Sequence, residues 1–179
     1  MKQDIIIPQA VIEAPRMILR PLRASDAGLM SMYAADRRVA DMTTSIPHPL
    51  PPGMIEAFIA KAAKPGRSEY VWAMDATDFG GAELMGVIEL EAMDRGQSEV
   101  SYWVAPNMWN TGFASEAVTA LVQANPLKNN TIFASVFQDN LSAARVLTNA
   151  GFGYLGDAEA FSVARGAKVA TWTYLKRLA

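Results

Sequence analysis

The sequence predicts a single α/β domain with one mixed, mostly antiparallel twisted sheet of six to seven strands and about four flanking helices. The order of the patterns is the first observation. Helical spacing dominates before residue 64, strands joined by short turns follow, and strands then alternate with helices. The second is length, because 179 residues are enough for one sizeable core without disulfides or a metal.

The N-terminal part is expected to be mainly helical. Residues 1–15 place Pro8 and Pro15 around an apolar patch, which indicates an N-terminal arm or an edge strand, and the main domain is assigned to 16–179. Apolar residues closed by Pro21 predict a first strand over 16–22. The elements expected next are a helix capped by Ser25-Asp26 with Leu29, Met30 and Tyr33 at helical spacing, a short helix over 36–42, a proline-rich loop over 46–53 and a helix over 54–63.

The second part is expected to contain most of the sheet. Apolar runs bounded by turn residues predict strands over 70–74, 84–91, 99–105, 131–137, 152–155 and 169–175. The turn at 94–97 makes the strands before and after it antiparallel. A helix predicted over 112–125 joins 99–105 to 131–137, so these two strands are expected to run parallel. Asn140 and Gly151 are typical of the start and the end of the last helix.

Composition excludes several classes of site. The chain has no Cys, so thiol nucleophiles, thiolate metal ligands and disulfides are absent, and we expect a reducing cytoplasm as its location. One histidine, His48, cannot build a His-rich metal site, and we expect no metal. A net charge of −2 argues against nucleic acid as a partner. No window is apolar enough to span a membrane, and the first residues do not have the pattern of a signal peptide.

One glycine motif is misleading. Residues 151–156 match the dinucleotide pattern G-x-G-x-x-G, but that motif needs a strand before the glycines and a helix after them. Here a helix precedes and a strand follows, so Gly151 is better explained as a helix stop. There is no nucleophile elbow or phosphate-binding P-loop either, and His48 in its proline-rich loop is interpreted as a rim residue.

The stretch over 101–117 is the strongest candidate site. It predicts a strand, a turn, Gly112 and then a helix start. Such a start brings free backbone N–H groups and the positive end of the helix dipole to one point, where a phosphate group binds well. The sequence therefore predicts a phosphorylated cofactor at Gly112.

Three motifs in order resemble the GNAT superfamily of coenzyme-A-dependent N-acetyltransferases, and within it the branch of the ribosomal-protein alanine N-acetyltransferases. The motifs are Arg16-Met-Ile-Leu-Arg-Pro21, then Trp109-Asn-Thr-Gly-Phe-Ala114 after a Tyr-Trp strand, then an Asn140 helix that ends in Gly151-Phe152. Together they span about residues 16–175. The resemblance implies a sheet splayed at its central strands and acetyl-CoA as co-substrate.

The resemblance also implies where acetyl-CoA binds. The splayed strand would hold the pantetheine arm, the loop before the helix would hold the pyrophosphate, and the next helix would face the arm and the thiol. The residues assigned in this way are Trp103, Val104, Ala105, Trp109, Asn110, Thr111, Gly112, Phe113, Ala114, Ser115, Asn140, Ser142 and Arg145. Two residues depart from the superfamily pattern: Trp109 replaces Gln or Arg, and Asn110 replaces Gly and leaves one fewer position free to adopt positive φ. Asn140 has a second interpretation, as a simple N-cap.

Catalysis needs a base, an oxyanion site and a proton donor for the thiolate. Glu99 is the candidate base, acting directly or through water, and by strand alternation it shares a face with Ser101 and Trp103. An exposed strand-end carboxylate is the plain alternative, and Glu89 and Glu91 are weaker candidates. Leu147 stands where the family often has a tyrosine acid, so Ser142 or a water is left as proton donor. Backbone N–H groups near Val104 are candidates for the oxyanion site.

The acceptor side is less specific. The family architecture implies that the early helices and the last strands line the acceptor cleft. Candidate walls are Tyr33, the loop over 46–52, Trp72 and a turn over 161–168.

Two functions stay open at this stage, with a pure interaction module as a weaker third. The first is an N-acetyltransferase that moves an acetyl group from acetyl-CoA to a primary amine, either a protein N-terminus or a small molecule, by direct attack and without a metal. The second is a non-catalytic acyl-CoA-binding or sensing domain of the same fold, favoured by Leu147 and Asn110. The expected partners are acetyl-CoA and an amine acceptor, and a homodimer is left open.

Overall fold

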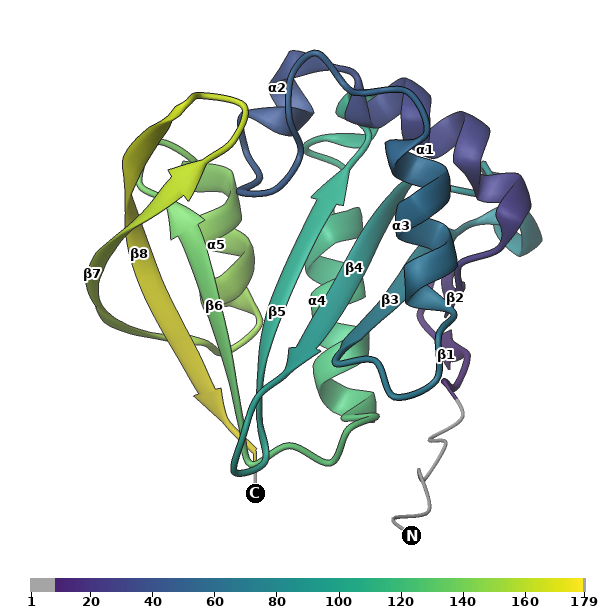
Figure 1. Cartoon of the computed structure of the whole chain (residues 1–179). Helices are drawn as coiled ribbons and strands as arrows, with labels where there is room; N and C mark the ends of the chain where they lie inside the picture. The colour runs from purple at the N-terminus through teal and green to yellow at the C-terminus, as the bar shows by residue number, and fades with distance from the viewer. Residues whose placement is uncertain (1–8, 179) are drawn as a thin grey trace, which may run out of the picture.

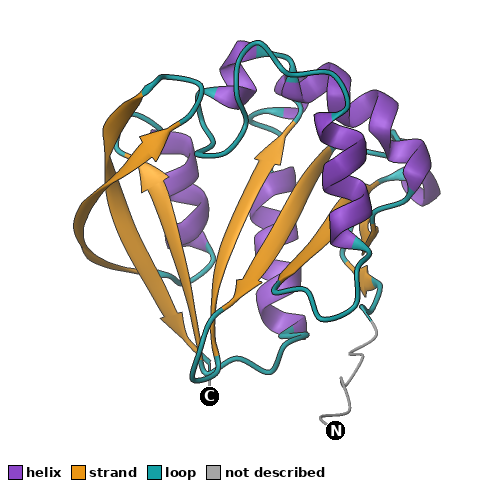
Figure 2. Ribbon diagram, viewed as in Figure 1, coloured by secondary structure: helices purple, strands orange, loops and turns teal. Residues whose placement is uncertain are grey.

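A computed structural model describes residues 9–178 of the chain. That part forms one sheet of eight strands in the order β1-β2-β3-β4-β5-β6-β8-β7 (Figures 1 and 2). The strands are β1 Ile12–Glu13, β2 Ile18–Pro21, β3 Glu69–Asp75, β4 Gly86–Ala92, β5 Gln97–Val104, β6 Thr131–Phe137, β7 Gly153–Ser162 and β8 Ala167–Arg177. The helices are α1 Ala27–Ala34, α2 Arg37–Ala40, α3 Met54–Ala62, α4 Phe113–Ala124 and α5 Leu141–Asn149.

The expected mixed α/β sheet is confirmed, but the expected six to seven strands and four helices were too few. The extra strand is β1, whose two residues pair antiparallel with Ile18 and Leu19. It lies within the segment 1–15, of which residues 1–8 fall outside the described part of the chain. A two-residue strand depends on its neighbour for its hydrogen bonds, so local sequence has little power to predict it.

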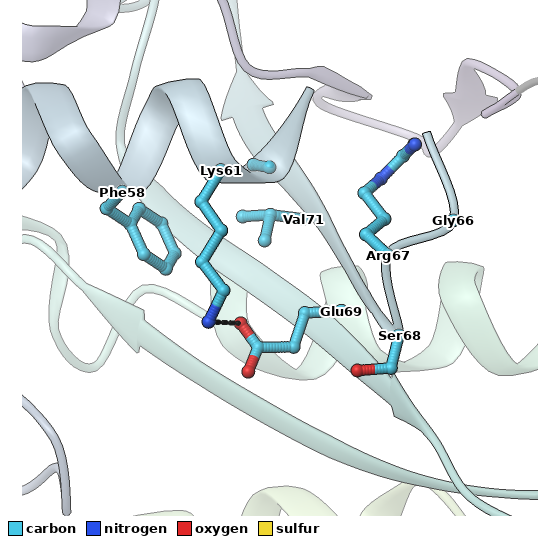
Figure 3. A pocket seen from close by; sticks show the side chains of 8 residues that line it. Phe58, Lys61, Gly66, Arg67, Ser68, Glu69 and Val71 are labelled. Carbon is cyan, nitrogen blue, oxygen red and sulfur yellow. Dashed lines mark ion pairs between the residues drawn. The ribbon is translucent and has the colours of Figure 1, made fainter. Parts of the chain in front are cut away.

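Two groups of helices cover opposite faces of the sheet. In β3, whose last five residues are buried on both faces, Val71 and Ala73 join the core beneath α1–α3, whereas Trp72 and Met74 join the core that includes α4 and α5. This alternation follows from the two-residue period of a strand. On the face covered by α1–α3, helix α3 and strand β3 border a small pocket of about 240 Å³, where Lys61 and Glu69 form a 3.8 Å ion pair (Figure 3).

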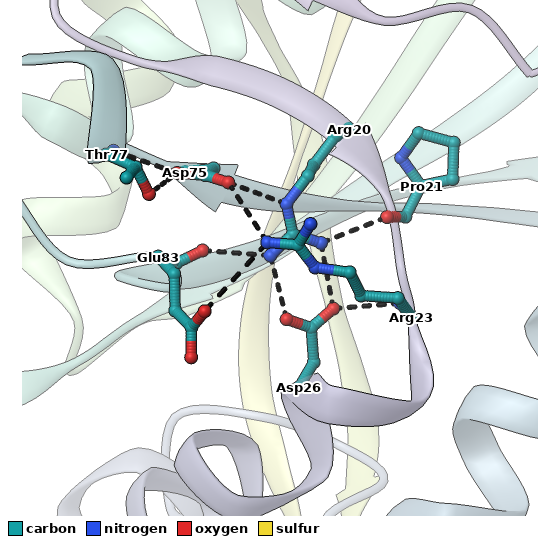
Figure 4. A network of polar contacts seen from close by, with 7 residues as sticks. All are labelled: Arg20, Pro21, Arg23, Asp26, Asp75, Thr77 and Glu83. Atoms are coloured by element: carbon teal, nitrogen blue, oxygen red, sulfur yellow. Dashed lines mark hydrogen bonds and ion pairs between the residues drawn. The ribbon is translucent and has the colours of Figure 1, made fainter.

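A buried ion cluster centred on Arg20 joins β2 to β3 and to the start of α1 (Figure 4). The Arg20 guanidinium donates to Asp26 at 2.8 and 2.9 Å and to Asp75 at 2.7 Å. Asp26 also accepts from the backbone N–H of Arg23 and makes no side-chain cap to α1. Asp26 is the N-cap residue of α1, as expected, but its carboxylate caps no N–H group of that helix because Arg20 and the Arg23 N–H occupy it.

The last hairpin is longer than the sequence indicated. Strands over 152–155 and 169–175 were expected, with 161–168 as a turn, but β7 and β8 pair from Gly153 with Leu175 to Ser162 with Ala167. Most of β7 is exposed and polar or small, so it shows little of the apolar signal that predicts strands. Its hydrogen bonds to β8 define it instead.

The sheet is split at its centre. β5 and β6 run parallel, as expected, but they pair only through Gln97–Glu99 and residues 131–133. Beyond Glu99 the two strands diverge (Figures 1 and 2). The rest of β5 keeps its antiparallel partner β4 on the other side, up to the pair of Val104 with Gly86. This divergence confirms the expected splay and, within residues 9–178, leaves one backbone edge of β5 without a strand partner.

Candidate functional site

A cleft of about 910 Å³ occupies the split between β5 and β6. It runs from the α4 and α5 side of the sheet through the split to the side covered by α1–α3. Most of the predicted site residues line it: Glu99, Trp103, Val104, Trp109, Asn110, Gly112, Phe113, Ala114, Ser115, Asn140, Ser142 and Arg145. Ala105 and Thr111 are not among its lining residues.

The backbone direction of β5 decides which of its groups face the split. The N–H of Ala105 donates to the carbonyl of Met85 at 2.8 Å, beside β4. Since backbone groups alternate sides along a strand, Trp103 also points toward β4, and Tyr102 and Val104 point toward the split. The Val104 carbonyl accepts from the Trp109 indole at 2.8 Å, which agrees with this direction. The backbone groups of Tyr102 and Val104 are thus the ones that an extended ligand can reach.

The loop before α4 has the geometry of an anion site. Gly112 is the N-cap residue of α4, with φ of 84°, a conformation that side chains disfavour. In the described structure no side chain caps the helix, and no protein acceptor pairs with the N–H groups of residues 113–115. Asn110 has φ of 61°, so this asparagine adopts the left-handed conformation that the replaced glycine would offer. Its departure from the superfamily pattern therefore leaves a positive-φ position in the loop.

The start of α5 forms the facing wall. The Asn140 side chain accepts from the N–H of Ala143 at 3.1 Å, so the N-cap interpretation of Asn140 is confirmed. Its amide Nδ2 stays unused by the cap and lies in a residue that lines the cleft. Ser142 and Arg145 are exposed along the same wall. Leu147 is fully buried, and its hydrocarbon side chain has no proton to donate.

Two carboxylates reach the cleft from neighbouring strands. Glu99 makes no hydrogen bond among the described residues, and burial raises its pKa above the usual value, with repulsion from Glu91 adding to the effect. Burial also raises the pKa of Glu89, although a 2.8 Å hydrogen bond from the Ser101 hydroxyl acts in the opposite direction. Both groups are thereby shifted toward the range in which a carboxylate exchanges protons near neutral pH.

The structure makes Glu89 a stronger candidate than the sequence did. Glu89 pairs with Ser101 across β4 and β5, on the same face as Glu99. Strand alternation predicted this face, but only the register places Ser101 beside Glu89. Tyr102 was missed as well: its hydroxyl is buried without a hydrogen-bond partner in the described structure, and burial raises its pKa. The only sequence signal for Tyr102 was its place in the Tyr-Trp motif.

The acceptor side differs from the expected walls. Trp72 is fully buried, donates to the Ala10 carbonyl and lies in the core instead of in the cleft. Tyr33 packs edge-on against Trp103, with 6.5 Å between ring centroids, one layer behind the cleft wall. Of the expected proline-rich loop, Ile46 and Leu50 do line the cleft. Only Ala160, just before the expected 161–168 wall, lines it from β7.

Hydrogen bonds join the β7–β8 turn to the loop after α2 on the acceptor side of the cleft. The N–H of Val163 donates to the carbonyl of Thr44 at 3.1 Å, and Arg165 donates to the carbonyl of Asp41 at 2.9 Å. Arg165 also forms an ion pair with Asp139 at 2.6 Å. The β7–β8 turn is therefore tied to the loop after α2 and to the loop before α5.

A comparison with known families decides what this arrangement belongs to. The family model described as acetyltransferase (GNAT) domain matches residues 16–153. The chain belongs to the GNAT acetyltransferase family. The N-acetyltransferase YoaA of Bacillus subtilis (strain 168), whose function is uncharacterized, is 28% identical over 151 residues, which cover 79% of this chain and 82% of YoaA.

Solved structures share the GNAT fold at low identity. The microcin C7 self-immunity acetyltransferase MccE, solved with acetyl-CoA and AMP, has a TM-score of 0.78 and 13% identity, covering 98% of this chain and 100% of MccE. RimL, a ribosomal L7/L12 α-N-protein acetyltransferase solved with coenzyme A, has a TM-score of 0.80 and 13% identity, covering 94% and 98%. RimL is one structural neighbour among several, so these likenesses establish the GNAT fold and no single branch.

The described residues contain neither a candidate metal site nor a membrane-spanning helix. Among residues 9–178 there is no group of three His, Asp or Glu side chains that is arranged to hold a metal ion. No helix in the same range is both long and apolar enough to cross a bilayer.

Proposed function

We propose that the protein is an acetyl-CoA-dependent N-acetyltransferase that acetylates a primary amine, on a protein N-terminus or a small molecule, by direct attack. One observation carries the proposal. A single cleft joins the Gly112 helix start, the unpaired edge of β5 and the carboxylates of Glu89 and Glu99. These are the groups needed for an anionic cofactor end, an extended arm and an amine.

The residues fit acetyl-CoA, which supplies the acetyl group as a thioester. The free N–H groups after Gly112 suit its pyrophosphate. The backbone groups of Tyr102 and Val104 are suited to hydrogen bonds with the amides of its pantetheine arm. The Asn140 side chain, on the opposite wall of the cleft, is suited to contact the same arm. With the arm along β5, the thioester lies in the split, between the α5 start and the two carboxylates.

In the proposed reaction Glu99 accepts a proton from the acceptor ammonium, directly or through water. The neutral amine forms the new C–N bond at the thioester carbon, and N–H groups near Val104 stabilise the oxyanion. The C–S bond then breaks, and the thiolate takes a proton from Ser142 or a water, which regains one from the proton that the acetylated nitrogen loses on becoming an amide. Glu99 passes its own proton on to solvent, so atoms and charge balance.

Calorimetry with acetyl-CoA tests the binding part. We expect saturable binding to the native protein and none to Gly112→Glu, because a carboxylate would enter the anion site and a side chain is strained at φ of 84°. Gly80→Glu is the matched control, since Gly80 has φ of 78° and no atom within 4 Å of its would-be Cβ. Absence of binding at millimolar acetyl-CoA would reject the proposed function.

A non-catalytic acyl-CoA-binding domain is the second candidate, and the buried Leu147 favours it. The two functions separate in an assay of coenzyme A release across a panel of peptides, amino acids and polyamines. Turnover above the acceptor-free rate on any amine rejects the binding-only function. Binding without turnover across the panel supports it.

A further inference from the structure

The segment that forms the proposed anion site lacks basic residues. Residues 105–124, which include the loop and all of α4, contain no Lys or Arg, and Glu116 is their only charged side chain. Glu116 lies in the first turn of α4, where a carboxylate suits the helix dipole but repels a bound phosphate. Any cation that assists a phosphate at this site must therefore come from elsewhere in the chain.

Arg16 lies at this loop although it is about a hundred residues away in sequence. Its backbone N–H donates to Glu116 Oε2 and its Nε–H to Glu116 Oε1, both at 2.9 Å. Both oxygens of the carboxylate are thus paired, and the Glu116 side chain is only 13% exposed. This pairing offsets the negative charge that would otherwise oppose the anion.

The guanidinium also holds the loop on both sides of Gly112. Arg16 Nη2 donates to the Thr111 carbonyl at 3.0 Å, and the guanidinium carbon lies 4.2 Å from the centre of the Phe113 ring, within cation–π range. A Cβ atom on Gly112 would lie 3.3 Å from Nη2. Glycine at this position therefore serves two needs, positive φ and room for the arginine.

One end of the guanidinium is left free. Nε and Nη2 are used within the protein, whereas Nη1 makes no hydrogen bond to the described residues, and the side chain is 47% exposed. An arginine offers five N–H donors in a planar fork that matches phosphate oxygens. The Nη1 donors are thus available to an anion that binds at the loop.

We propose that Arg16 is a cofactor-binding residue, which braces the Gly112 loop through Nε and Nη2 and donates from Nη1 to a phosphate group of acetyl-CoA. The inference rests on the proposed function, since it assumes that acetyl-CoA binds in the cleft. It adds a cation that the loop itself does not contain. The turn between β1 and β2, which contains Arg16, thereby becomes part of the binding site.

Calorimetric titration of coenzyme A into the native protein, R16Q and R23Q tests the proposal. R23Q is the matched control, because the Arg23 side chain is similarly exposed, at 51%, and pairs with Asp75 and Glu83 far from the loop in sequence. We expect R16Q to weaken binding about tenfold or more, the loss of one charge-assisted hydrogen bond, and R23Q to leave it unchanged.

Salt dependence separates a phosphate contact from a merely structural role. Native affinity is expected to fall as salt rises, and R16Q is expected to show a shallower fall. Equal affinity of R16Q and native protein, or weaker affinity with an unchanged salt dependence, would overturn the proposal. If the native protein binds no coenzyme A, the proposed function itself fails, which is a different result.

Two further titrations complete the test. Dephospho-coenzyme A, which lacks the 3′-phosphate, identifies the partner: a persisting R16Q effect assigns the pyrophosphate, and a lost effect assigns the 3′-phosphate. If R16Q does not fold, R16K decides. A lysine cannot brace the loop and bind a phosphate together, so affinity should fall about threefold or more. Unchanged affinity of R16K would then overturn the proposal.

Discussion

The indole N–H of Trp109 donates a 2.8 Å hydrogen bond to the carbonyl oxygen of Val104. That carbonyl belongs to the edge of β5 that faces the split, so the indole occupies a backbone acceptor that an extended ligand would use. Trp109 is still 40% exposed, and Arg38 from α2 lies 5.6 Å from its ring centre. Ligand binding along β5 therefore changes the surroundings of this side chain directly.

Trp109 fluorescence should report coenzyme A binding. We expect titration with coenzyme A to shift or quench the emission of the native protein, because the indole loses or changes its bond to Val104. Trp109→Phe should remove most of the change. Trp172→Phe, on β8, is the control and should keep it. A full fluorescence response in Trp109→Phe would mean that ligand binding leaves the surroundings of Trp109 unchanged.

Arg20→Met should strongly destabilise the fold. The substitution leaves Asp26 and Asp75 buried without their partner, and breaking such a pair costs about 3–5 kcal/mol. Denaturant unfolding followed by circular dichroism measures the loss. Arg23→Met is the control, because Arg23 is half exposed and its ion pairs of 3.6 and 3.9 Å are longer. A loss of less than about 1 kcal/mol for Arg20→Met, the value of a surface pair, would contradict a structural role.

The same cluster predicts a pH dependence. Burial pushes the pKa of Asp75 up, but hydrogen bonds from Thr77 and Arg20 outweigh it and hold the pKa below its ordinary value. A carboxyl with a depressed folded-state pKa stabilises the protein above its unfolded pKa. That stability is lost as pH falls from the ordinary Asp range through the folded pKa. Asp75→Asn should show a weaker loss of stability over this acidic window.

Two glycine-to-alanine changes should act in opposite directions. An alanine Cβ at Gly86 would lie 2.4 Å from the Trp103 carbonyl oxygen and 3.0 Å from the Val104 Cα, so β4 and β5 must separate. We expect a destabilisation of about 1–3 kcal/mol, as for overpacked cores. Gly28→Ala, inside α1 and with no atom near its would-be Cβ, should stabilise by about 1 kcal/mol. If Gly86→Ala raised the unfolding midpoint as Gly28→Ala does, the close approach of β5 to Gly86 would be contradicted.

The sequence predicted those parts of the fold in which local signals and long-range pairing agree. The parallel β5–β6 pair followed from a helix between two apolar strands, and the α4 start followed from Gly112. The extension of β7 beyond the expected 152–155 and the contact of Asp26 with Arg20 did not follow. An exposed strand depends on its partner for its hydrogen bonds, and a carboxylate suited to a helix cap can instead pair with a buried arginine of the preceding strand.

In the candidate site, too, local motifs predicted some residues, whereas long-range packing determined others. Motifs identified residues that are close in sequence, such as the loop from Trp109 to Ser115. The family architecture made Trp72 a candidate wall of the cleft, because an aromatic residue of a core and one of a pocket look alike in sequence. The motifs gave Arg16 no role, because its contacts with Thr111 and Glu116 exist only after β1 and β2 have packed beside α4. Strand register and packing determine contacts between residues far apart in the sequence, and the periodicity of the sequence does not reveal these contacts.

Glu99→Gln should remove the low-pH limb of the activity. If Glu99 is the base, it must be ionised, so turnover rises with pH through its pKa, which burial and Glu91 raise above the ordinary Glu value of 4.5. At neutral pH we expect kcat/KM of Glu99→Gln to fall about 10²–10⁴-fold, the usual contribution of a general base. Initial rates across a pH series, with the best acceptor from the panel, measure both effects.

High pH distinguishes a base from a structural residue. An acceptor amine that is already neutral needs no proton acceptor, so Glu99→Gln should recover toward the native rate as pH approaches the pKa of the amine. A deficit at high pH as large as that at neutral pH would argue against the base role. Glu91→Gln gives the complementary control. It removes the charge that raises the pKa of Glu99, so the low-pH limb should move to lower pH without loss of the maximal rate.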